Sequence, residues 1–197
     1  MKNKKILSLL FICTMIMSLC GCGNTKTVEE TRKVTIPYNL SSISGMGADD
    51  DLNDMINSFN EEKKYCNKAY LNKNKDIVLV STDSQIKEYV KDNKKFINSA
   101  MKKFTKSNKL YKYELANDYS SIKLYFDETI SEGVYKQLIP ASMLATSLNF
   151  ILLNGEKDWH FKWEVINCHT NKTVVTWNLP NDEENSLTPD DWRQSYE

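Results

Sequence analysis

The chain has 197 residues with 26 basic and 26 acidic side chains, so its formal charge is balanced. Only two of the basic residues are arginine, whereas phosphate binding favours a basic face with arginine forks. No glycine-rich loop is followed by Lys-Ser or Lys-Thr, as a phosphate-cradling loop requires. The sequence therefore predicts neither a nucleic-acid partner nor a cofactor.

The first 21 residues have the composition of an export signal. A positive head at Lys2, Lys4 and Lys5 precedes an apolar run over residues 6–19. This order is typical of a secretory signal peptide. The run is too short for a membrane span, which needs about 20 apolar residues. We therefore expect residues 1–21 to direct export.

The motif Leu19-Cys20-Gly21-Cys22 resembles the lipobox of bacterial lipoproteins, in which a leucine stands three residues before the modified cysteine and a glycine directly before it. Cys20 departs from the pattern, because a small residue usually takes that position. The resemblance implies cleavage before Cys22 and diacylglycerol, with palmitoyl-type chains, on its thiol. Two or more acyl chains give a stable anchor. The alternative is a plain secretory signal or an uncleaved anchor helix.

Cleavage would leave 176 residues with 23 basic and 26 acidic side chains, a net charge of −3. This length suits one domain. We expect a lipidated flexible tether over residues 22–33, a single domain over 34–180 and an acidic, loop-like tail over 181–197. Because the charge is mildly acidic, membrane contact is expected through the anchor alone.

Hydrophobic periodicity predicts alternating helices and strand pairs in the domain. The expected strands cover residues 34–38, 69–71, 77–80, 110–115, 122–126, 159–168 and 173–179, and the expected helices cover residues 49–62, 86–104 and 133–153. Strand pairs joined by short turns favour a largely antiparallel sheet with about three helices packed against it. The predicted fold class is α+β.

The helix over 86–104 has the clearest pattern. Thr82 is a candidate N-cap, with Gln85 three residues on, as in a capping box. An apolar stripe runs along one side, and the other faces carry Lys87, Lys91, Lys94, Lys95, Lys102 and Lys103. The pattern predicts an amphipathic helix on a core, and the alternative is a helix lying on a membrane.

The helix over 133–153 is apolar around most of its circumference, which predicts a central buried position. Pro140 marks either its true start or a kink, and Gly155 follows at a stop position. Polar residues interrupt its apolar run, so we do not expect it to span a membrane.

Two groups of residues were open to more than one interpretation. Cys66 and Cys168 can form a disulfide in an oxidising compartment or remain separate buried thiols. Trp159, Phe161 and Trp163 lie on one face of a predicted strand. They form either a ligand-binding face or a part of the core packed against the buried helix.

No metal or catalytic site is predicted. Asp49, Asp50 and Asp51 begin a helix, where acidic side chains complement the helix dipole. His160 and His169 are the two histidines, and a zinc site usually needs several His or Cys at close spacing. A serine elbow is also missing from the sequence.

The chain as a whole resembles small lipoproteins of Gram-positive anaerobes, which implies an extracytoplasmic location on the cell membrane and no defined activity. We expect a non-catalytic binding or protein-interaction module of the cell envelope, with an unidentified protein or small-molecule partner. One alternative is a hydrolase acting on an envelope polymer with paired carboxylates. A second alternative is an accessory subunit of a membrane complex.

Overall fold

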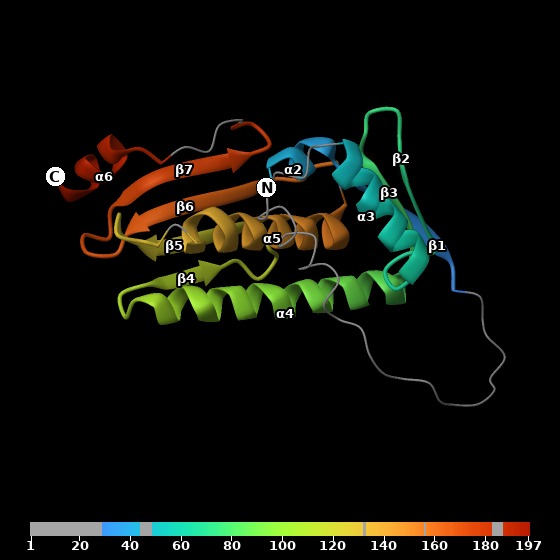
Figure 1. The fold of residues 1–197 in the computed structure, drawn as a ribbon, viewed down its shortest axis with the longest axis horizontal. Helices are drawn as coiled ribbons and strands as arrows, with labels where there is room; N and C mark the ends of the chain where they lie inside the picture. The colour runs from blue at the N-terminus through green and yellow to red at the C-terminus, as the bar shows by residue number, and fades with distance from the viewer. Residues whose placement is uncertain (1–28, 44–48, 132, 156, 183–186) are drawn as a thin grey trace.

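The computed structural model describes residues 29–43, 49–131, 133–155, 157–182 and 187–197. The predicted signal peptide, Cys22 and the tether up to residue 28 lie outside the described residues. Figure 1 shows the fold, with both sheets and helices, which confirms the α+β class.

The described elements alternate along the chain much as expected. In order they are β1 (Thr31–Ile36), α2 (Tyr38–Ile43), α3 (Asp49–Glu62), β2 (Lys68–Leu71), β3 (Ile77–Thr82), α4 (Asp83–Ser107), β4 (Lys112–Leu115), β5 (Ser121–Phe126), the π-helical η1 (Val134–Leu138), α5 (Ile139–Asn154), β6 (Phe161–Asn167), β7 (Thr173–Leu179) and α6 (Pro189–Tyr196). The three predicted helices correspond to α3, α4 and the η1–α5 segment. The helices α2 and α6 were not predicted.

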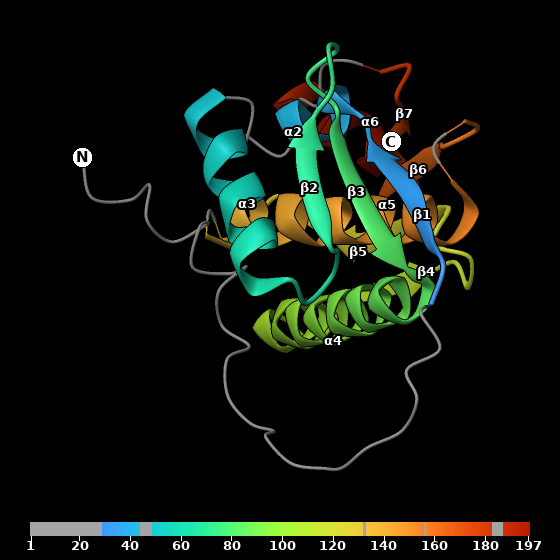
Figure 2. The ribbon, with the colours of Figure 1, turned by 90° about the vertical axis from the view of Figure 1, so that its right-hand side faces the viewer.

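The strands form two sheets rather than one. The smaller sheet has the order β1-β3-β2 and is antiparallel. The larger has the order β4-β5-β6-β7, in which only the β5–β6 pair is parallel. Figure 2 shows the smaller sheet across one end of the molecule. The sheets separate because α4, about 37 Å long at 1.5 Å per residue, carries the chain from β3 to β4.

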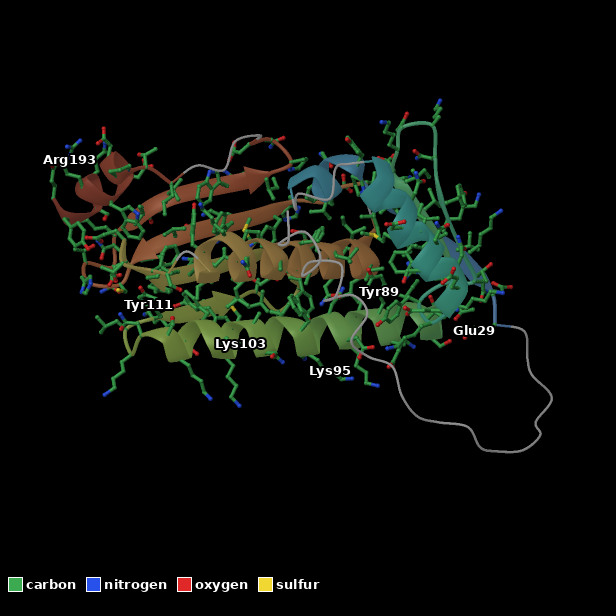
Figure 3. The ribbon with its side chains drawn as sticks, viewed as in Figure 1. Glu29, Tyr89, Lys95, Lys103, Tyr111 and Arg193 are labelled. Carbon is green, nitrogen blue, oxygen red and sulfur yellow. The ribbon has the colours of Figure 1, made fainter. Side chains whose placement is uncertain are left out.

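The helix α4 forms as its sequence predicts. The Thr82 hydroxyl oxygen accepts a hydrogen bond from the backbone N–H of Gln85. In return, the side-chain oxygen of Gln85 accepts one from the backbone N–H of Thr82, which completes the capping box. Its apolar stripe, including Ile97, Met101 and Phe104, is fully buried. The opposite face points into solvent (Figure 3). The expected amphipathic helix on a core is confirmed.

The helix α5 is buried on nearly all sides, as predicted. Pro140 lies in its first turn. Proline has no backbone N–H and cannot donate a helical hydrogen bond to the preceding turn. The π-helical segment η1 lies immediately before α5. Gly155 ends the helix with a positive φ of 90°. The segment Val134–Asn154 is long and apolar enough to cross a membrane, but most of it is buried inside the fold, as in a core helix.

The folded domain extends beyond both predicted boundaries. The strand β1 begins at Thr31, inside the segment expected to be a tether. The C-terminal segment is not loop-like throughout, because Thr188 and Asp191 form a capping box that starts α6. Trp192 is buried and its ring lies 5.5 Å from that of Phe126, edge to face. Burial of this apolar ring holds α6 on the domain.

Candidate functional site

The most concentrated polar chemistry in the described structure lies where two parallel strands end. Phe126 of β5 is in register with Asn167 of β6. The residues that follow, Asp127 on one side and Cys168 and His169 on the other, therefore emerge at the same edge of the sheet. The carboxyl ends of parallel strands are common ligand-binding positions in open sheets.

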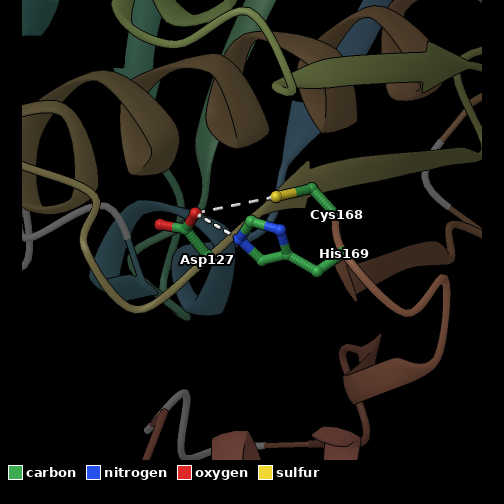
Figure 4. Close-up of side chains that lie close together, drawn as sticks. All are labelled: Asp127, Cys168 and His169. Carbon is green, nitrogen blue, oxygen red and sulfur yellow. Dashed lines mark hydrogen bonds and ion pairs between the residues drawn. The ribbon is translucent and has the colours of Figure 1, made fainter.

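Asp127 is the centre of this cluster, and its side chain is only 6% exposed. One carboxylate oxygen, Oδ1, accepts hydrogen bonds from the Thr129 amide at 3.0 Å and the Tyr111 hydroxyl at 3.0 Å. The other, Oδ2, lies 2.9 Å from His169 Nε2 and 3.7 Å from Cys168 Sγ (Figure 4). The two oxygens thus have separate roles: Oδ1 fixes the local turn, and Oδ2 faces the thiol and the imidazole.

The protonation states follow from this geometry. Although burial of Asp127 opposes ionisation, hydrogen bonds from Thr129, Tyr111 and His169 lower the pKa of its carboxyl below the usual value. Burial, together with the nearby Asp127 charge, raises the pKa of the Cys168 thiol to about 11. The thiol is therefore protonated at neutral pH, whereas a cysteine nucleophile needs a lowered pKa.

The helix α6 borders this cluster. The Tyr196 ring stacks on His169 with centroids 6.4 Å apart, and its hydroxyl donates to Glu128 Oε2 at 2.6 Å. The Ser195 hydroxyl accepts from the buried Asn167 side chain at 2.8 Å. The two strand ends are therefore held by side chains from the C-terminal helix.

An open groove of about 280 Å³ lies beside the cluster. Its lining mixes apolar and charged side chains: Glu128, Ile130, Tyr135, Lys136, Leu187 and Trp192. Glu128 is the one carboxylate in this lining, and it already accepts from Tyr196. A glycosidase-like mechanism needs two carboxylates that face each other. This described lining therefore holds one of the two carboxylates that such a mechanism uses.

The second notable surface is the outer face of α4 and the turn after it. Residues 93–109 contain no acidic residue, and all of their lysines are exposed: Lys94, Lys95, Lys102, Lys103, Lys106 and Lys109. Figure 3 shows Lys95 and Lys103 pointing away from the body of the molecule. Lys95 pairs with Asp92, whereas within the described part of the chain Lys102 and Lys103 form no ion pair. We call these six side chains the lysine face.

The proposed aromatic ligand face belongs to the core. Trp159, Phe161 and Trp163 are 8%, 1% and 3% exposed, and Trp163 stacks on Trp177 with centroids 4.1 Å apart. They pack in one hydrophobic cluster with Leu148 and Ile151 of α5. Because all three rings are buried in this cluster, the core interpretation holds.

The proposed disulfide does not form. Cys66 and Cys168 are both free thiols. Cys66 lies just before β2 with its Sγ 3.9 Å from the Phe59 carbonyl, whereas Cys168 follows β6 and lies beside Asp127. Figure 1 shows these two places at opposite ends of the molecule.

The two histidines do not meet either, because they lie at opposite ends of β6. His160 packs edge to face on Phe150 and is not in the cluster. Cys168 and His169 are adjacent in the sequence, but no local pattern indicated Asp127, which is 41 residues from Cys168. Only the parallel pairing of β5 with β6 brings these residues together, and periodicity predicts strands without their partners.

The chain was also compared with known proteins. No family model, curated protein or solved structure matches it.

Proposed function

We propose that this protein is a lipoprotein of the cell envelope, anchored by acyl chains on Cys22 at the extracytoplasmic face of the membrane, and that its domain is a non-catalytic binding module. The lipobox-like motif at Leu19, Gly21 and Cys22 supports the anchor. The groove beside the Asp127 cluster, lined by both apolar and charged side chains, supports a binding role.

A short tether supports a close position of the domain over the lipid. Six residues lie between Cys22 and Glu29, and the seven steps from one to the other span at most about 25 Å. Glu29 accepts a hydrogen bond from the backbone amide of Ser84 at 2.9 Å, in the first turn of α4. The start of α4 therefore stays within about 25 Å of the anchored residue.

The lysine face carries this proposal further and gives the domain an orientation. Each basic residue close to an anionic membrane surface contributes about 1 kcal/mol, and the attraction fades within one Debye length. The six lysines lie on the half of α4 that runs away from the tethered end and on the turn after it, beginning ten residues after Ser84 or about 15 Å along the helix, and Figure 3 shows Lys95 and Lys103 on this side. We infer that α4 lies along the anionic headgroups, although the net charge of the mature chain is negative. This adds a membrane contact to the anchor expected from the sequence.

The anchor is tested by metabolic labelling with an alkyne analogue of palmitate in a host that processes lipoproteins. The wild-type chain is expected to take up the label and to sediment with membranes. The variant Cys22→Ala is expected to lose the label and to be released, while Cys20→Ala serves as the matched control and keeps both. Unlabelled wild-type protein would refute the anchor.

The orientation is tested separately with an environment-sensitive fluorophore on single cysteines. Lys103→Cys lies on the lysine face, and Lys73→Cys lies in the turn between β2 and β3. On vesicles with one third phosphatidylglycerol, spin-labelled lipid is expected to quench the probe at position 103 and not at 73. Equal quenching at both positions would refute the orientation without bearing on lipidation.

A further inference from the structure

The cluster at the carboxyl ends of β5 and β6 presents three different metal-ligand atoms to one point. One ligand atom from each of Asp127, Cys168 and His169 lies within 4.8 Å of the other two. Figure 4 shows the thiol and the imidazole converging on the same carboxylate oxygen. We propose that these residues bind a divalent transition-metal ion of the Zn²⁺ type.

The separations are close to those of a tetrahedral zinc site. Zinc bonds of about 2.0 Å to oxygen and nitrogen and about 2.3 Å to sulfur place ligand atoms roughly 3.3–3.6 Å apart. The Oδ2–Nε2 distance is 2.9 Å and the Oδ2–Sγ distance is 3.7 Å. Shifts of a few tenths of an ångström at Asp127, and a rotation that brings Sγ nearer Nε2, complete three of the four positions.

The surroundings leave the ligand atoms available. The Asp127 carboxylate is oriented through Oδ1 by Thr129 and Tyr111, in the way that outer hydrogen bonds orient metal ligands. Its Oδ2 has the thiol and imidazole as its partners in the described structure. His169 is 45% exposed, which gives an ion a path from solvent. With three protein ligands, the proposed ion would take water as its fourth ligand, as zinc does in sites that bind an exogenous ligand.

The donor set determines the class of ion. A thiolate with an imidazole selects Zn²⁺ and its neighbours, whereas Ca²⁺ and Mg²⁺ prefer sites built of oxygen alone. On binding, the thiol proton is released to solvent and the sulfur ligates as thiolate. The competing interpretation is an Asp–His ion pair beside an Asx turn, with a thiol nearby by chance. That interpretation predicts no stoichiometric metal binding.

The first measurement is a titration of the full chain, purified in detergent, with Co²⁺ followed by Zn²⁺. We expect one equivalent of Co²⁺ to produce a sulfur-to-cobalt charge-transfer band and the visible bands of a tetrahedral site, and Zn²⁺ to displace it. Absence of a saturable band in the folded wild-type chain would overturn the proposal. Ca²⁺ and Mg²⁺ at equal concentration are expected to leave the spectrum unchanged.

Variants then assign the ligands. His169→Gln and Cys168→Ser are expected to weaken Zn²⁺ binding by roughly tenfold or more, and Cys168→Ser removes the charge-transfer band. The matched controls are His160→Gln, at the other end of β6, and Cys66→Ala, in the other part of the molecule; both should bind as the wild type does. Because His169 is half exposed, its variant is expected to fold. A band that persists in Cys168→Ser and disappears in Cys66→Ala would overturn the assignment.

Discussion

Glu29 and Ser84 join the first described residue of the chain to the first turn of α4, 55 residues later. The Ser84 backbone amide donates to one Glu29 carboxylate oxygen at 2.9 Å, and its hydroxyl donates to the other. These hydrogen bonds from Ser84 lower the pKa of the Glu29 carboxyl. The same helix that carries the lysines therefore holds the end of the tether.

Neutralising the lysine face is expected to abolish vesicle binding. We predict that Lys94→Gln, Lys102→Gln, Lys103→Gln and Lys106→Gln together lower the affinity of the Cys22→Ala chain for anionic vesicles roughly 100- to 1,000-fold, at about 1 kcal/mol for each lysine. Sedimentation with phosphatidylglycerol vesicles at 50 mM and 200 mM salt measures this. The control replaces four exposed lysines elsewhere, Lys68, Lys73, Lys157 and Lys172; equal losses in both sets would refute a local lysine face.

The buried amides of Asn93 and Asn149 link α4 to α5, with Nδ2 of Asn93 donating to Oδ1 of Asn149 at 3.0 Å. We expect Asn93→Leu alone to destabilise the domain by about 1–3 kcal/mol, because the Asn149 amide is then left buried without a partner. The double variant Asn93→Leu/Asn149→Leu should cost less than the sum of the two single variants. Urea unfolding of the four proteins measures the difference, and strictly additive costs would contradict the coupling.

Asp92 gives the domain an acid-dependent contribution to its stability. Although burial opposes ionisation, hydrogen bonds from Lys64 and Lys95 lower the pKa of its carboxyl to about 2. A folded-state pKa below the unfolded value of about 3.9 gives stability that is complete above about pH 5 and is lost as the pH falls toward 2. We predict that Asp92→Asn costs about 1–2 kcal/mol at pH 7 and little at pH 2.

The measurement for Asp92 is thermal or urea unfolding across pH 2–7. Asp83→Asn is the matched control, because Asp83 is 67% exposed in its ion pair with Arg32 and surface substitutions of this kind stay within about 0.5 kcal/mol. A gap between wild type and Asp92→Asn that is the same at pH 2 and pH 7 would contradict the assignment.

The C-terminal helix is expected to be part of the cooperative unit. Trp192→Ala removes a buried ring that packs on Phe126, and we predict a loss of about 3 kcal/mol, as for other large-to-small core changes. Arg193→Ala, which removes an exposed ion pair with Asp190, should change stability by less than about 0.5 kcal/mol. A Trp192→Ala variant as stable as the wild type would mean that α6 is detached in solution.

The sequence predicted the elements whose signals are local. The helix over 49–62 has the same bounds as α3, and the capping residues Thr82 and Gln85 act as expected. Capping residues, hydrophobic periodicity and stop residues act within a few turns of one helix, so they can be recognised from a short stretch of sequence. The same logic would have found α6, because Thr188 and Asp191 carry the same capping pattern before Trp192.

Some features of the fold depend on contacts that local patterns do not contain. The aromatic residues Trp159, Phe161 and Trp163 were consistent with a ligand face or a core, and only their burial in the tertiary structure decided for the core. The cysteines could not be paired or separated from their spacing, because loop closure between residues 66 and 168 depends on the whole fold.

The sequence by itself therefore determined the lipobox-like motif, most of the order of helices and strands, and the amphipathic character of α4. Tertiary structure alone decided the division into two sheets, the parallel pairing of β5 with β6 and, through it, the meeting of Asp127 with Cys168 and His169. The physical reason is that hydrophobic periods specify which face of an element is buried, while strand partners are selected by packing between segments far apart in the chain.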